Sequence, residues 1–409
     1  MSFQEKLAKY ADLAVRVGAG VKKDQEVIVN APINCYELAR FVTAKAYEAG
    51  AKRVVVEYGD QHITHALLKN ASEEVLSDFP QWRVDGLLGM IRKGAAIISI
   101  VSADPELMMD IEPKKMGLFQ KAAALASEEY KNYVMQGNTC WTIVAHANAP
   151  WAKKVFPKLE ETQAIDALWD KIFEATRMHE PDPVKAWENH LNLLDDKLEL
   201  LNGKNFVKFH YKAPGTDLVV GMPESHKWIG GGQLSLTGDK FLPNIPTEEV
   251  FSTPHKYQVD GTLASTKPLV YGGKLIENFS FTFEKGKVVD YKAEVGQDAL
   301  ANLFATDDGS MYLGEIAIVP HDSPISNTNV TFFNTLFDEN ASCHFAFGNA
   351  YLLSVEDADK HSKEKLDEMG VNLSLSHVDF MVGSGELNIT GTTASGEEII
   401  VFDKGNWKI

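Results

Sequence analysis

The first half of the chain alternates short apolar runs with longer stretches whose apolar residues recur at helical spacing. Residues 34–51 and 62–93 show this helical spacing and separate the first three apolar runs. Strands that alternate with helices need crossover connections, which are typical of a mainly parallel sheet. We therefore predict an α/β N-terminal domain. Its four predicted strands lie at residues 25–32, 52–59, 95–103 and 140–148.

A long amphipathic helix is predicted to begin at Pro183. Asp182 can cap this helix, Pro183 suits its first turn, and the pair Asn202 and Gly203 can end it. We expect its apolar stripe to pack against a domain and not to bind a ligand, and we place a domain boundary in this region. The stripe consists of Val184, Trp187, Leu191, Leu194, Leu198 and Leu201.

The second half changes to a pattern rich in strands and turns. Residues 205–223 and 276–294 are each typical of a β-hairpin, with the turns PGTD and EKGK. Helical stretches are predicted near residues 296–304 and 329–340, so this half is predicted to be α+β. The two predicted domains are the α/β part at residues 1–190 and the α+β part at residues 191–409.

Composition and charge narrow the possible partners. The 409 residues are too many for one ordinary core, which supports two domains. The formal net charge of −17 argues against nucleic acid and against anionic membranes as partners. No apolar run approaches the ~18 residues that a membrane-spanning helix needs, so no membrane association is expected.

The chain lacks the sequence signatures of a signal peptide, of a disulfide or zinc framework, and of nucleotide binding. The first residues, MSFQEKLAKYADLAVRVG, contain no apolar core of signal-peptide length. The three cysteines, Cys35, Cys140 and Cys343, are far apart and fit neither a disulfide framework nor a zinc ribbon, so we expect a cytoplasmic protein. The glycine-rich motifs of nucleotide binding are absent as well, and nothing in the sequence supports a nucleotide-dependent enzyme.

One predicted strand carries an imidazole and a carboxylate on the same face. Within SLSHVDFMVGS, residues 374–384, alternate side chains point to opposite faces, so His377 and Asp379 share a face with Leu375. Both faces also carry apolar residues, so the strand is predicted to be buried on both sides. A buried carboxylate is costly unless it is paired or binds a metal. A His–Asp hydrogen bond inside a core and a metal site therefore both fit this strand.

Further polar groups occupy four other short stretches of the second half. Taken singly, each has an ordinary explanation, such as a solvated loop charge, an ion pair, a helix end or a core histidine. Glu224 and His226 in GMPESHKWIGGG are expected to be exposed turn residues outside any site. The remaining groups are Glu248 and Glu249 in NIPTEEVFSTP, Glu315 in LGEIAIVPHD, and Asp338, Glu339, His344 and Tyr351 in LFDENASCHFAFGNAY.

Taken together, these groups favour a metal centre. Several buried carboxylates beside two histidines repel one another unless cations compensate their charge. Mixed Asp, Glu and His ligation without cysteine suits Zn, Co or Mn, and carboxylate-rich sites also accept Mg. Five or six ligands exceed the need of one catalytic zinc, whereas two divalent ions ~3.5–4 Å apart would use them all. Spacing along the chain does not by itself bring these segments together.

Four motifs in order resemble the aminopeptidase T/aminopeptidase S/PepS family of metalloaminopeptidases. They are NIPTEEVFSTP, LGEIAIVP, DENASCHFAFGNAY and SHVDFMVGS. The resemblance covers nearly the whole chain and is most specific after residue 215. It implies an N-terminal α/β domain, a C-terminal domain that carries two divalent ions, removal of N-terminal residues from peptides, and a homodimer.

The resemblance also implies a set of metal ligands and a catalytic tyrosine. As a mechanistic hypothesis, Tyr351 donates a hydrogen bond to the oxyanion of the tetrahedral intermediate, and Glu248 relays a proton. Glu315 could combine a bridging role with that of proton relay. The implied metal ligands are Glu249, Glu315, Glu339, His344, His377 and Asp379.

Three alternatives remain open on the sequence alone. The chain could be another metal-dependent amidohydrolase that acts on non-peptide substrates. It could be a non-catalytic protein that binds metal or peptide and keeps the same fold. It could also be a nucleotide-dependent enzyme that uses the N-terminal sheet, although the missing glycine motifs count against that interpretation.

Overall fold

The computed structural model describes residues 2–272 and 274–409, and the chain divides into two compact units. The first unit extends to Asn189 and also contains the segment Gly232–Pro246, while the second unit comprises the rest. The chain passes from the first unit to the second within helix α10 (Pro183–Lys204). The segment Gly232–Pro246 follows the expected boundary at residue 190 in sequence, yet it belongs to the first unit.

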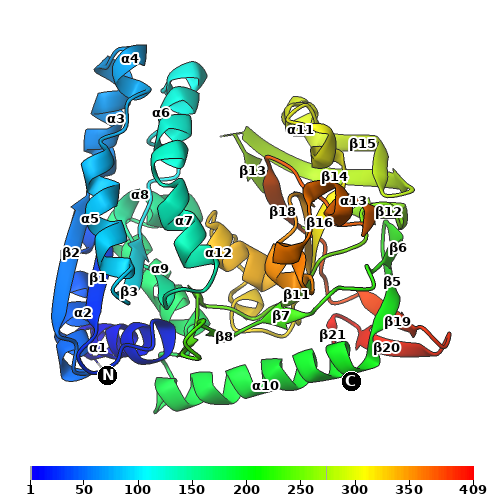
Figure 1. Ribbon diagram of the computed structural model, residues 1–409, viewed down its shortest axis with the longest axis horizontal. Coiled ribbons are helices and arrows are strands. Elements are labelled where there is room, and N and C mark those ends of the chain that lie inside the picture. Colours follow the sequence, from blue (N-terminus) through cyan, green and yellow to red (C-terminus); the bar gives the residue numbers. More distant parts are fainter. Residues whose placement is uncertain (1, 273) are drawn as a thin grey trace. The chain divides into compact units, whose positions relative to one another are not determined.

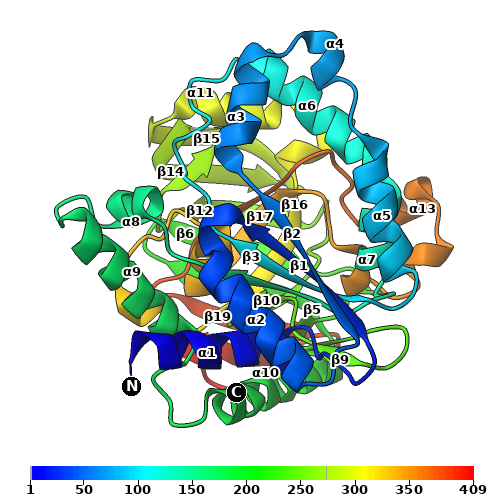
Figure 2. The same ribbon diagram turned by 90° about the vertical axis from the view of Figure 1, so that its left-hand side faces the viewer.

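The first unit is built on a five-stranded sheet with the order β10-β4-β3-β1-β2, and all of its neighbouring strands are parallel. Figure 2 shows β1, β2 and β3 running side by side. The apolar runs of the sequence predicted four of these strands, and the segment that returns from the second half adds β10. The strands are β1 (Glu26–Pro32), β2 (Arg53–Gly59), β3 (Ala96–Val101), β4 (Trp141–Ala145) and β10 (Asn244–Ile245).

Helices connect the parallel strands, as the α/β pattern predicts. The predicted helical stretch at residues 62–93 is divided into α3, α4 and α5, because Ser72 caps a new helix and Pro80 precedes the next. A short hairpin, β8 (Gln233–Leu234) with β9 (Lys240–Phe241), also belongs to this unit. The helices are α1 (Phe3–Leu13), α2 (Tyr36–Glu48), α3 (Gln61–Asn70), α4 (Glu73–Leu76), α5 (Gln81–Ile91), α6 (Pro113–Ala126), α7 (Glu128–Met135), α8 (Ala149–Val155) and α9 (Glu161–Ala175).

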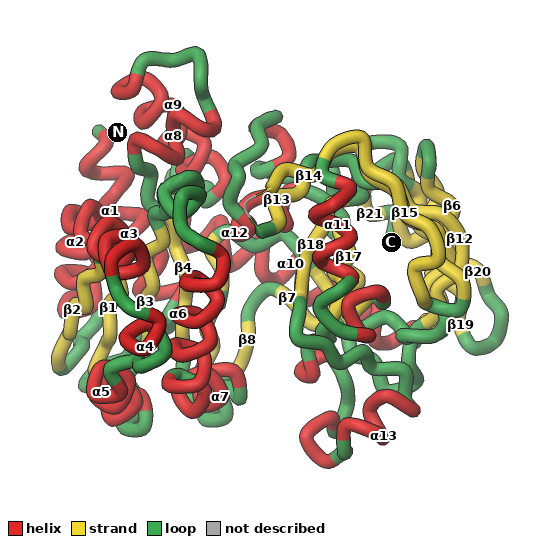
Figure 3. Tube along the Cα trace, turned by 90° about the horizontal axis from the view of Figure 1, so that it is seen from above, coloured by secondary structure: helices red, strands yellow, loops and turns green. Residues whose placement is uncertain are grey.

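The second unit contains two antiparallel sheets. The smaller sheet has the order β18-β17-β16-β11-β7, and the larger sheet runs from β13 to β21 with β15 paired to β14. Figure 1 shows these strands in green to red, and Figure 3 shows them in yellow. The smaller sheet comprises β7 (Ile229–Gly230), β11 (Val250–Ser252), β16 (Leu313–Ile318), β17 (His344–Gly348) and β18 (His377–Met381). The larger comprises β5 (Phe206–Ala213), β6 (Thr216–Gly221), β12 (Val259–Ala264), β13 (Leu269–Tyr271), β14 (Lys274–Glu284), β15 (Lys287–Val295), β19 (Asn388–Thr393), β20 (Glu398–Asp403) and β21 (Asn406–Trp407).

Helices in the second unit are few and mostly short. Helix α10 spans the predicted range, and three members of its stripe, Trp187, Leu194 and Leu201, are buried. The predicted helix at residues 329–340 is wrong for its first half, because Asn329 and Phe333 both adopt φ of 53° and an α-helix cannot continue through them. Besides α10, the α-helices are α11 (Gln297–Phe304), α12 (Thr335–Asp338) and α13 (Lys363–Glu368).

The predicted fold class is confirmed by these two units: a parallel α/β unit and a mainly antiparallel α+β unit. None of the described helices has both the length and the apolar composition needed to cross a bilayer.

Candidate metal centre

Neighbouring strands of the smaller sheet place the predicted ligands on one face. Glu315 on β16 pairs with Ala346 on β17, and Ala346 pairs with Asp379 on β18. Residues directly opposite each other in a sheet point to the same side, and so do residues two apart along a strand. His344 therefore shares a face with Ala346, and His377 shares it with Asp379.

Glu249 extends this face from the next strand. Phe251 on β11 pairs with Ala317 on β16, which lies two residues from Glu315. Glu249 precedes β11 by one residue and lies two residues before Phe251, so the same alternation directs it toward Glu315. Two small residues lie on the same face: Ala317 pairs with His344, and Ala346 pairs with both Glu315 and Asp379.

The opposite face of the same strands is apolar and closes the core between the two sheets. Its side chains belong to one buried cluster that also contains residues of the larger sheet, such as Phe281. The rings of Phe347 and Phe380 stack with their centroids 4.8 Å apart. The residues of this face are Val250, Ile316, Ile318, Phe345, Phe347 and Phe380. The alternation along each strand thus anchors one face in the core and presents the other face for chemistry.

The candidate ligand atoms converge into two groups that share Glu315. The first group is Glu249, Glu315 and His344, the second is Glu315, His377 and Asp379, and the ligand atoms within each group lie within 4.8 Å of one another. Glu315 directs its two oxygens to different imidazoles: Oε1 lies 3.5 Å from His344 Nε2, and Oε2 lies 3.4 Å from His377 Nε2. The two remaining contacts are His344 Nε2–Glu249 Oε2 at 3.3 Å and His377 Nε2–Asp379 Oδ1 at 3.2 Å.

Backbone carbonyls fix both imidazole rings. His344 Nδ1 donates to the carbonyl of Ser342 at 3.0 Å, and His377 Nδ1 donates to the carbonyl of Asn349 at 2.8 Å. A carbonyl can only accept, so Nδ1 carries the proton in both rings. In the neutral imidazoles, the lone pair of Nε2 then faces the carboxylate oxygens. This arrangement is typical of histidine ligands, whose second ring nitrogen is held by an acceptor of the protein.

The charge of the cluster also fits a cation. Glu249 Oε2 and Glu315 Oε2 are buried, and neither has a hydrogen-bond partner among the described residues. Burial, and the negative charge of Asp379, raise the pKa of Glu315 to about 7 although His344 opposes this shift. Burial alone would lower the pKa of His344, but its contacts with Glu249 and Glu315 raise it well above its usual value. Buried carboxylate oxygens without donors, opposed by imidazole lone pairs, suit a divalent metal.

His377 and Asp379 show the same electrostatic coupling. Burial would lower the pKa of His377, but contact with Asp379 raises it to about 9. The pKa of Asp379 is lowered because His377 outweighs the effect of burial. In the absence of metal, protons on these rings can offset the carboxylate charge. Metal and protons therefore compete for the same ring nitrogens.

Glu339 lies beside the two groups, in the turn that follows α12. Burial, followed by the negative charges of Glu249 and Asp379, raises the pKa of Glu339 well above its usual value. Asn340 connects this turn to the residues that precede β11, Glu248 and Glu249. Its Oδ1 accepts from the N–H of Glu248 at 2.8 Å, and its Nδ2 donates to Glu339 Oε1 at 3.4 Å. Asn340 is not among the predicted site residues, because no signal in the sequence distinguishes it from other asparagines.

Tyr351 follows β17 and approaches the centre from the side of β18. Its ring lies 4.7 Å from the ring of His377, centroid to centroid, and 5.7 Å from that of Phe251. The residue is 38% exposed. Desolvation, and after it the negative charges of Glu315 and Asp379, raise its pKa, so the hydroxyl keeps its proton. Tyr351 can therefore donate a hydrogen bond beside the predicted ligands.

Comparisons with known proteins identify the family of this chain. The model of the thermophilic metalloprotease (M29) family matches residues 3–407 of the chain. The chain belongs to the thermophilic metalloprotease (M29) family. Aminopeptidase AmpS of Bacillus subtilis is 47% identical over 99% of both chains. Aminopeptidase T of Thermus thermophilus is 42% identical over 100% of both chains.

A solved structure supports the same assignment. Wild-type AmpT from Thermus thermophilus matches this M29 chain with a TM-score of 0.94 and 41% identity, and the match covers 100% of each chain. The resemblance drawn from the four motifs is therefore confirmed, and so is the expectation of a metalloaminopeptidase at the level of the family. A metalloprotease of this family implies a divalent metal, and the two groups that share Glu315 are its candidate ligands.

Glu248, the predicted proton relay of this M29 chain, lies in a different environment from Glu249. Its carboxylate is buried, and Oε2 lies 3.4 Å from His190 Nε2. His190 in turn contacts the carbonyl of Thr247 through Nε2 at 2.9 Å. Within the described residues, neither of the two ligand groups includes Glu248. Its assignment as a proton relay stays a prediction.

Other expectations for this M29 chain need correction. His226 is buried, and its Nδ1 lies 2.6 Å from the carbonyl of Pro223, whereas Glu224 is exposed as expected. Leu375 is 87% exposed, because β18 begins only at His377, so the predicted face of the strand is shorter than the sequence pattern suggested. Asp338 accepts from the N–H groups of Phe332 and Asn334 and supports the turn before Glu339.

Proposed function

We propose that the chain is an aminopeptidase that uses two divalent ions, held by Glu249, Glu315, Glu339, His344, His377 and Asp379 in the second unit. The observation that supports this proposal is the position of Glu315 between two ligand groups, with one oxygen toward each imidazole. Glu315 would therefore contribute to the ligands of both ions in a two-metal site.

Charge balance favours two ions over one. Four carboxylates, Glu249, Glu315, Glu339 and Asp379, influence one another electrostatically, and two imidazoles complete the cluster. With neutral imidazoles the ligand set carries four negative charges, which two divalent cations would neutralise. One divalent ion would leave about two uncompensated charges in a largely buried site, which is costly.

Bound ions supply a water of lowered pKa and polarise the scissile carbonyl of the peptide. The residues of the chain provide the rest. Tyr351 keeps its proton and donates a hydrogen bond to the developing oxyanion. Glu248, or Glu315 in addition to its role as a ligand, accepts the proton of the attacking water and passes it to the leaving amine, because both are buried carboxylates beside the proposed ligands. The free amino group of the substrate would bind within the acidic cluster, which makes the enzyme an exopeptidase.

The remaining properties extend the proposal. The Asp, Glu and His donor set suits Zn, Co or Mn, and Mg is the alternative that a carboxylate-rich site allows. Cys35, Cys140 and Cys343 are buried free thiols, which supports a reducing, cytoplasmic location. We further propose a homodimer, as the resemblance implies, and no nucleic-acid or membrane partner. The relatives named as aminopeptidases support peptides as the substrates.

Metal removal and the variant His344→Ala test this function. Purified protein should release amino acids from aminoacyl-p-nitroanilides, chelation should abolish this activity, and Co²⁺ or Zn²⁺ should restore it. His344→Ala should lose at least about 100-fold in activity and bind less metal, because even outer partners of metal ligands cost 10–100-fold. Elemental analysis should find about two ions per wild-type chain.

A second histidine–aspartate pair provides the matched control. His210 Nε2 lies 2.6 Å from Asp217 Oδ1 in the β5–β6 hairpin, outside both ligand groups. His210→Ala should therefore keep wild-type activity and metal content. Full activity of metal-stripped His344→Ala protein would contradict the proposal, and a single ion in fully active enzyme would contradict its two-metal form.

A further inference from the structure

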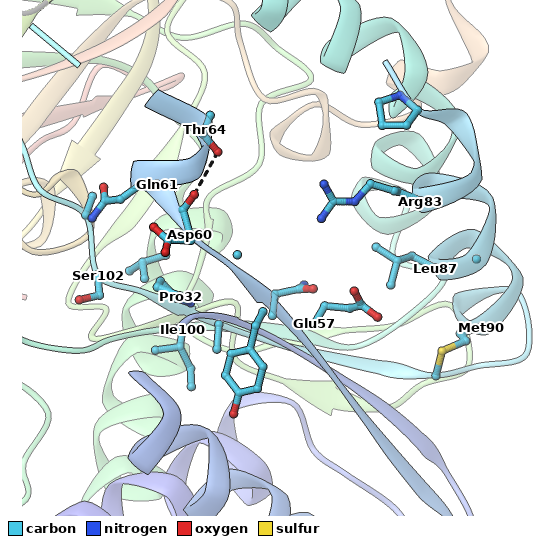
Figure 4. A pocket seen from close by; sticks show the side chains of 18 of the residues that line it. Pro32, Glu57, Asp60, Gln61, Thr64, Arg83, Leu87, Met90, Ile100 and Ser102 are labelled. Atoms are coloured by element: carbon cyan, nitrogen blue, oxygen red, sulfur yellow. Dashed lines mark hydrogen bonds between the residues drawn. The ribbon is translucent and has the colours of Figure 1, made fainter. Parts of the chain in front are cut away.

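The first unit contains a pocket formed entirely by residues between 30 and 103, with a volume of about 1000 Å³. Small-molecule sites typically enclose ~300–1,000 Å³, so this pocket has room for a ligand larger than a single amino acid. Figure 4 shows its walls and the side chains that point into it. None of the proposed metal ligands contributes to the pocket.

The pocket lies at the sheet edge where parallel α/β folds bind ligands. Residues at the carboxyl ends of β1, β2 and β3 line it, including Pro32, Gly59 and Val101. In the sheet order, β2 follows β1 on one side while β3 lies on the other side of β1. Ligands of open parallel sheets bind outside the carboxyl ends of the strands at such a switch point. The position of this pocket therefore favours a ligand site.

Charged side chains from opposite walls face the hollow. In Figure 4, the guanidinium of Arg83 extends from α5 toward the wall that carries Asp60 and Gln61, and Glu57 lies below it. Arg83 and Glu57 are exposed, and within residues 2–272 and 274–409 neither side chain has a hydrogen bond or an ion pair. Both charges are therefore available to a ligand.

Two aromatic residues and several apolar ones complete the lining. The aromatic residues are Trp82, which is 74% exposed, and Tyr58, which is 41% exposed. Leu87, Met90 and Ile100 contribute apolar surface. Exposed aromatic rings around a pocket commonly cover the apolar parts of a ligand.

The charges disfavour a nucleotide and favour a zwitterion. Asp60 already caps the N-terminus of α3, where its carboxylate accepts from the N–H of His62 at 2.8 Å, so a phosphate would meet a negative charge at this helix end. The carboxylates of Glu57 and Asp60 suit an ammonium group. The planar guanidinium of Arg83 suits a carboxylate, which it can bind through two parallel hydrogen bonds.

We propose that this pocket binds a short peptide with free amino and carboxyl termini. The α-ammonium group lies at Glu57 and Asp60, the terminal carboxylate binds Arg83, and Trp82 and Tyr58 cover the peptide side chains. This binding needs no metal and no hydrolysis, so it can be tested independently of the proposed function of the second unit.

Fluorine NMR of protein labelled with fluorotryptophan tests the proposal at the site itself. The chain has 7 tryptophans, and the variant Trp82→Phe assigns the resonance of Trp82. The binding experiment uses full-length Glu315→Gln protein, so that the peptide is not consumed. The tripeptide Ala-Leu-Ala should shift the Trp82 resonance in a saturable way. The same tripeptide with an acetylated N-terminus and an amidated C-terminus should not shift it.

Charge-removing variants identify the groups that bind. Arg83→Gln should weaken tripeptide binding about ten- to a hundredfold, as expected for the loss of a charge-assisted hydrogen-bonding partner. Glu57→Gln should weaken it in the same direction. Arg92→Gln is the matched control, because Arg92 follows α5, pairs with Glu129 and does not line the pocket. In an otherwise wild-type background, Arg92→Gln should also hydrolyse leucine-p-nitroanilide at the wild-type rate, because Arg92 lies outside the pocket and outside both ligand groups.

Three results would overturn the proposal. The first is an unchanged Trp82 resonance at millimolar tripeptide. The second is equal binding by Arg83→Gln and Arg92→Gln. The third is a saturable shift caused by AMP or NAD in place of the tripeptide, which would assign the pocket to a nucleotide.

Discussion

His344 and His377 show how the orientation of single side chains shapes the candidate metal centre. Each ring donates through Nδ1 to a backbone carbonyl, and each presents Nε2 to carboxylates of neighbouring strands. The acceptors are the backbone carbonyls of Ser342 and Asn349, so the residue types in the motifs do not predict them. At this scale the chemistry depends on the orientation of a ring as much as on the identity of the residue.

Tyr351→Phe tests the proposed oxyanion donor. Because the tyrosine keeps its proton, its loss should remove one hydrogen bond from the transition state and lower kcat on the order of 10²–10³-fold. Metal content and KM should change little, which steady-state kinetics and elemental analysis can measure. Tyr257→Phe is the control, since the Tyr257 hydroxyl donates to Asp367, and it should remain fully active. Equal kcat for both variants would exclude Tyr351 from catalysis.

At the scale of elements, the smaller sheet of the second unit separates packing from chemistry. One face of β16, β17 and β18 belongs to the aromatic core, and the other face carries the acidic and imidazole side chains. This separation needs the period of two along each strand and the correct register between strands, because a slip of one residue would exchange the two faces.

Ala346→Val tests that register. Ala346 lies between Glu315 and Asp379 in a row across the sheet, so a larger side chain should occupy the space between the ligands. We expect a folded protein, destabilised by about 1–3 kcal/mol through overpacking, with reduced metal content and more than tenfold lower activity. Circular dichroism and elemental analysis separate folding from metal loss. A variant with full metal content and activity would show that Ala346 does not face the ligands.

His146, which follows β4, gives the first unit a pH-dependent stability. Its ring packs edge-on against Trp169 of α9 at 4.8 Å, and its Nδ1 is buried without a hydrogen-bond partner in the described chain. Burial lowers its pKa to about 4 in the folded protein. The unfolded chain therefore takes up a proton at higher pH than the folded chain. Stability is full above the unfolded value near 6.5 and decreases as the pH falls toward about 4.

Denaturation at pH 7 and pH 5 measures this effect. The free energy of unfolding should fall by up to about 2 kcal/mol from this group between the two pH values, and His146→Phe should abolish that part of the loss. His62→Phe, at an exposed position, should leave the pH dependence unchanged. An identical pH dependence of His146→Phe and wild type would contradict the assignment.

At the scale of the whole molecule, proposed ligands that are more than one hundred residues apart in the sequence meet on one sheet. Glu249, on the N-terminal side of β11, and Asp379, on β18, lie at opposite ends of the row of proposed ligands. A bound metal would therefore connect strands that are far apart in the sequence. A ligand that binds the folded state and not the unfolded state stabilises the protein by mass action.

Thermal unfolding with and without metal tests this coupling. Divalent metal at about 1,000 times its Kd should stabilise the metal-free wild type by about 4 kcal/mol and raise its midpoint. Glu315→Gln should show little of this increase, because it removes the shared carboxylate. Glu364→Gln, in the first turn of α13, should respond like the wild type. Equal shifts for Glu315→Gln and Glu364→Gln would contradict the ligand assignment.

The sequence by itself determined the local elements and the chemistry of the motifs. Periodicity predicted the four strands β1 to β4, helix α10 and the two hairpins, because these depend on neighbours a few residues apart. It did not predict β10, since a two-residue strand has no period. It also did not predict the loss of helix before residue 335, where Asn329 and Phe333 adopt positive φ angles.

Only the tertiary structure decided which polar residues meet. The sequence could propose Glu249, Glu315, His344, His377 and Asp379, but strand register and sheet order placed them on one face. The same long-range pairing buried His226, which looked like a turn residue, and left Leu375 exposed. The carboxyl-end pocket of the first unit likewise arises from the order of parallel strands. Side-chain types are encoded locally, whereas their convergence depends on contacts between residues distant in the chain, which local patterns do not contain.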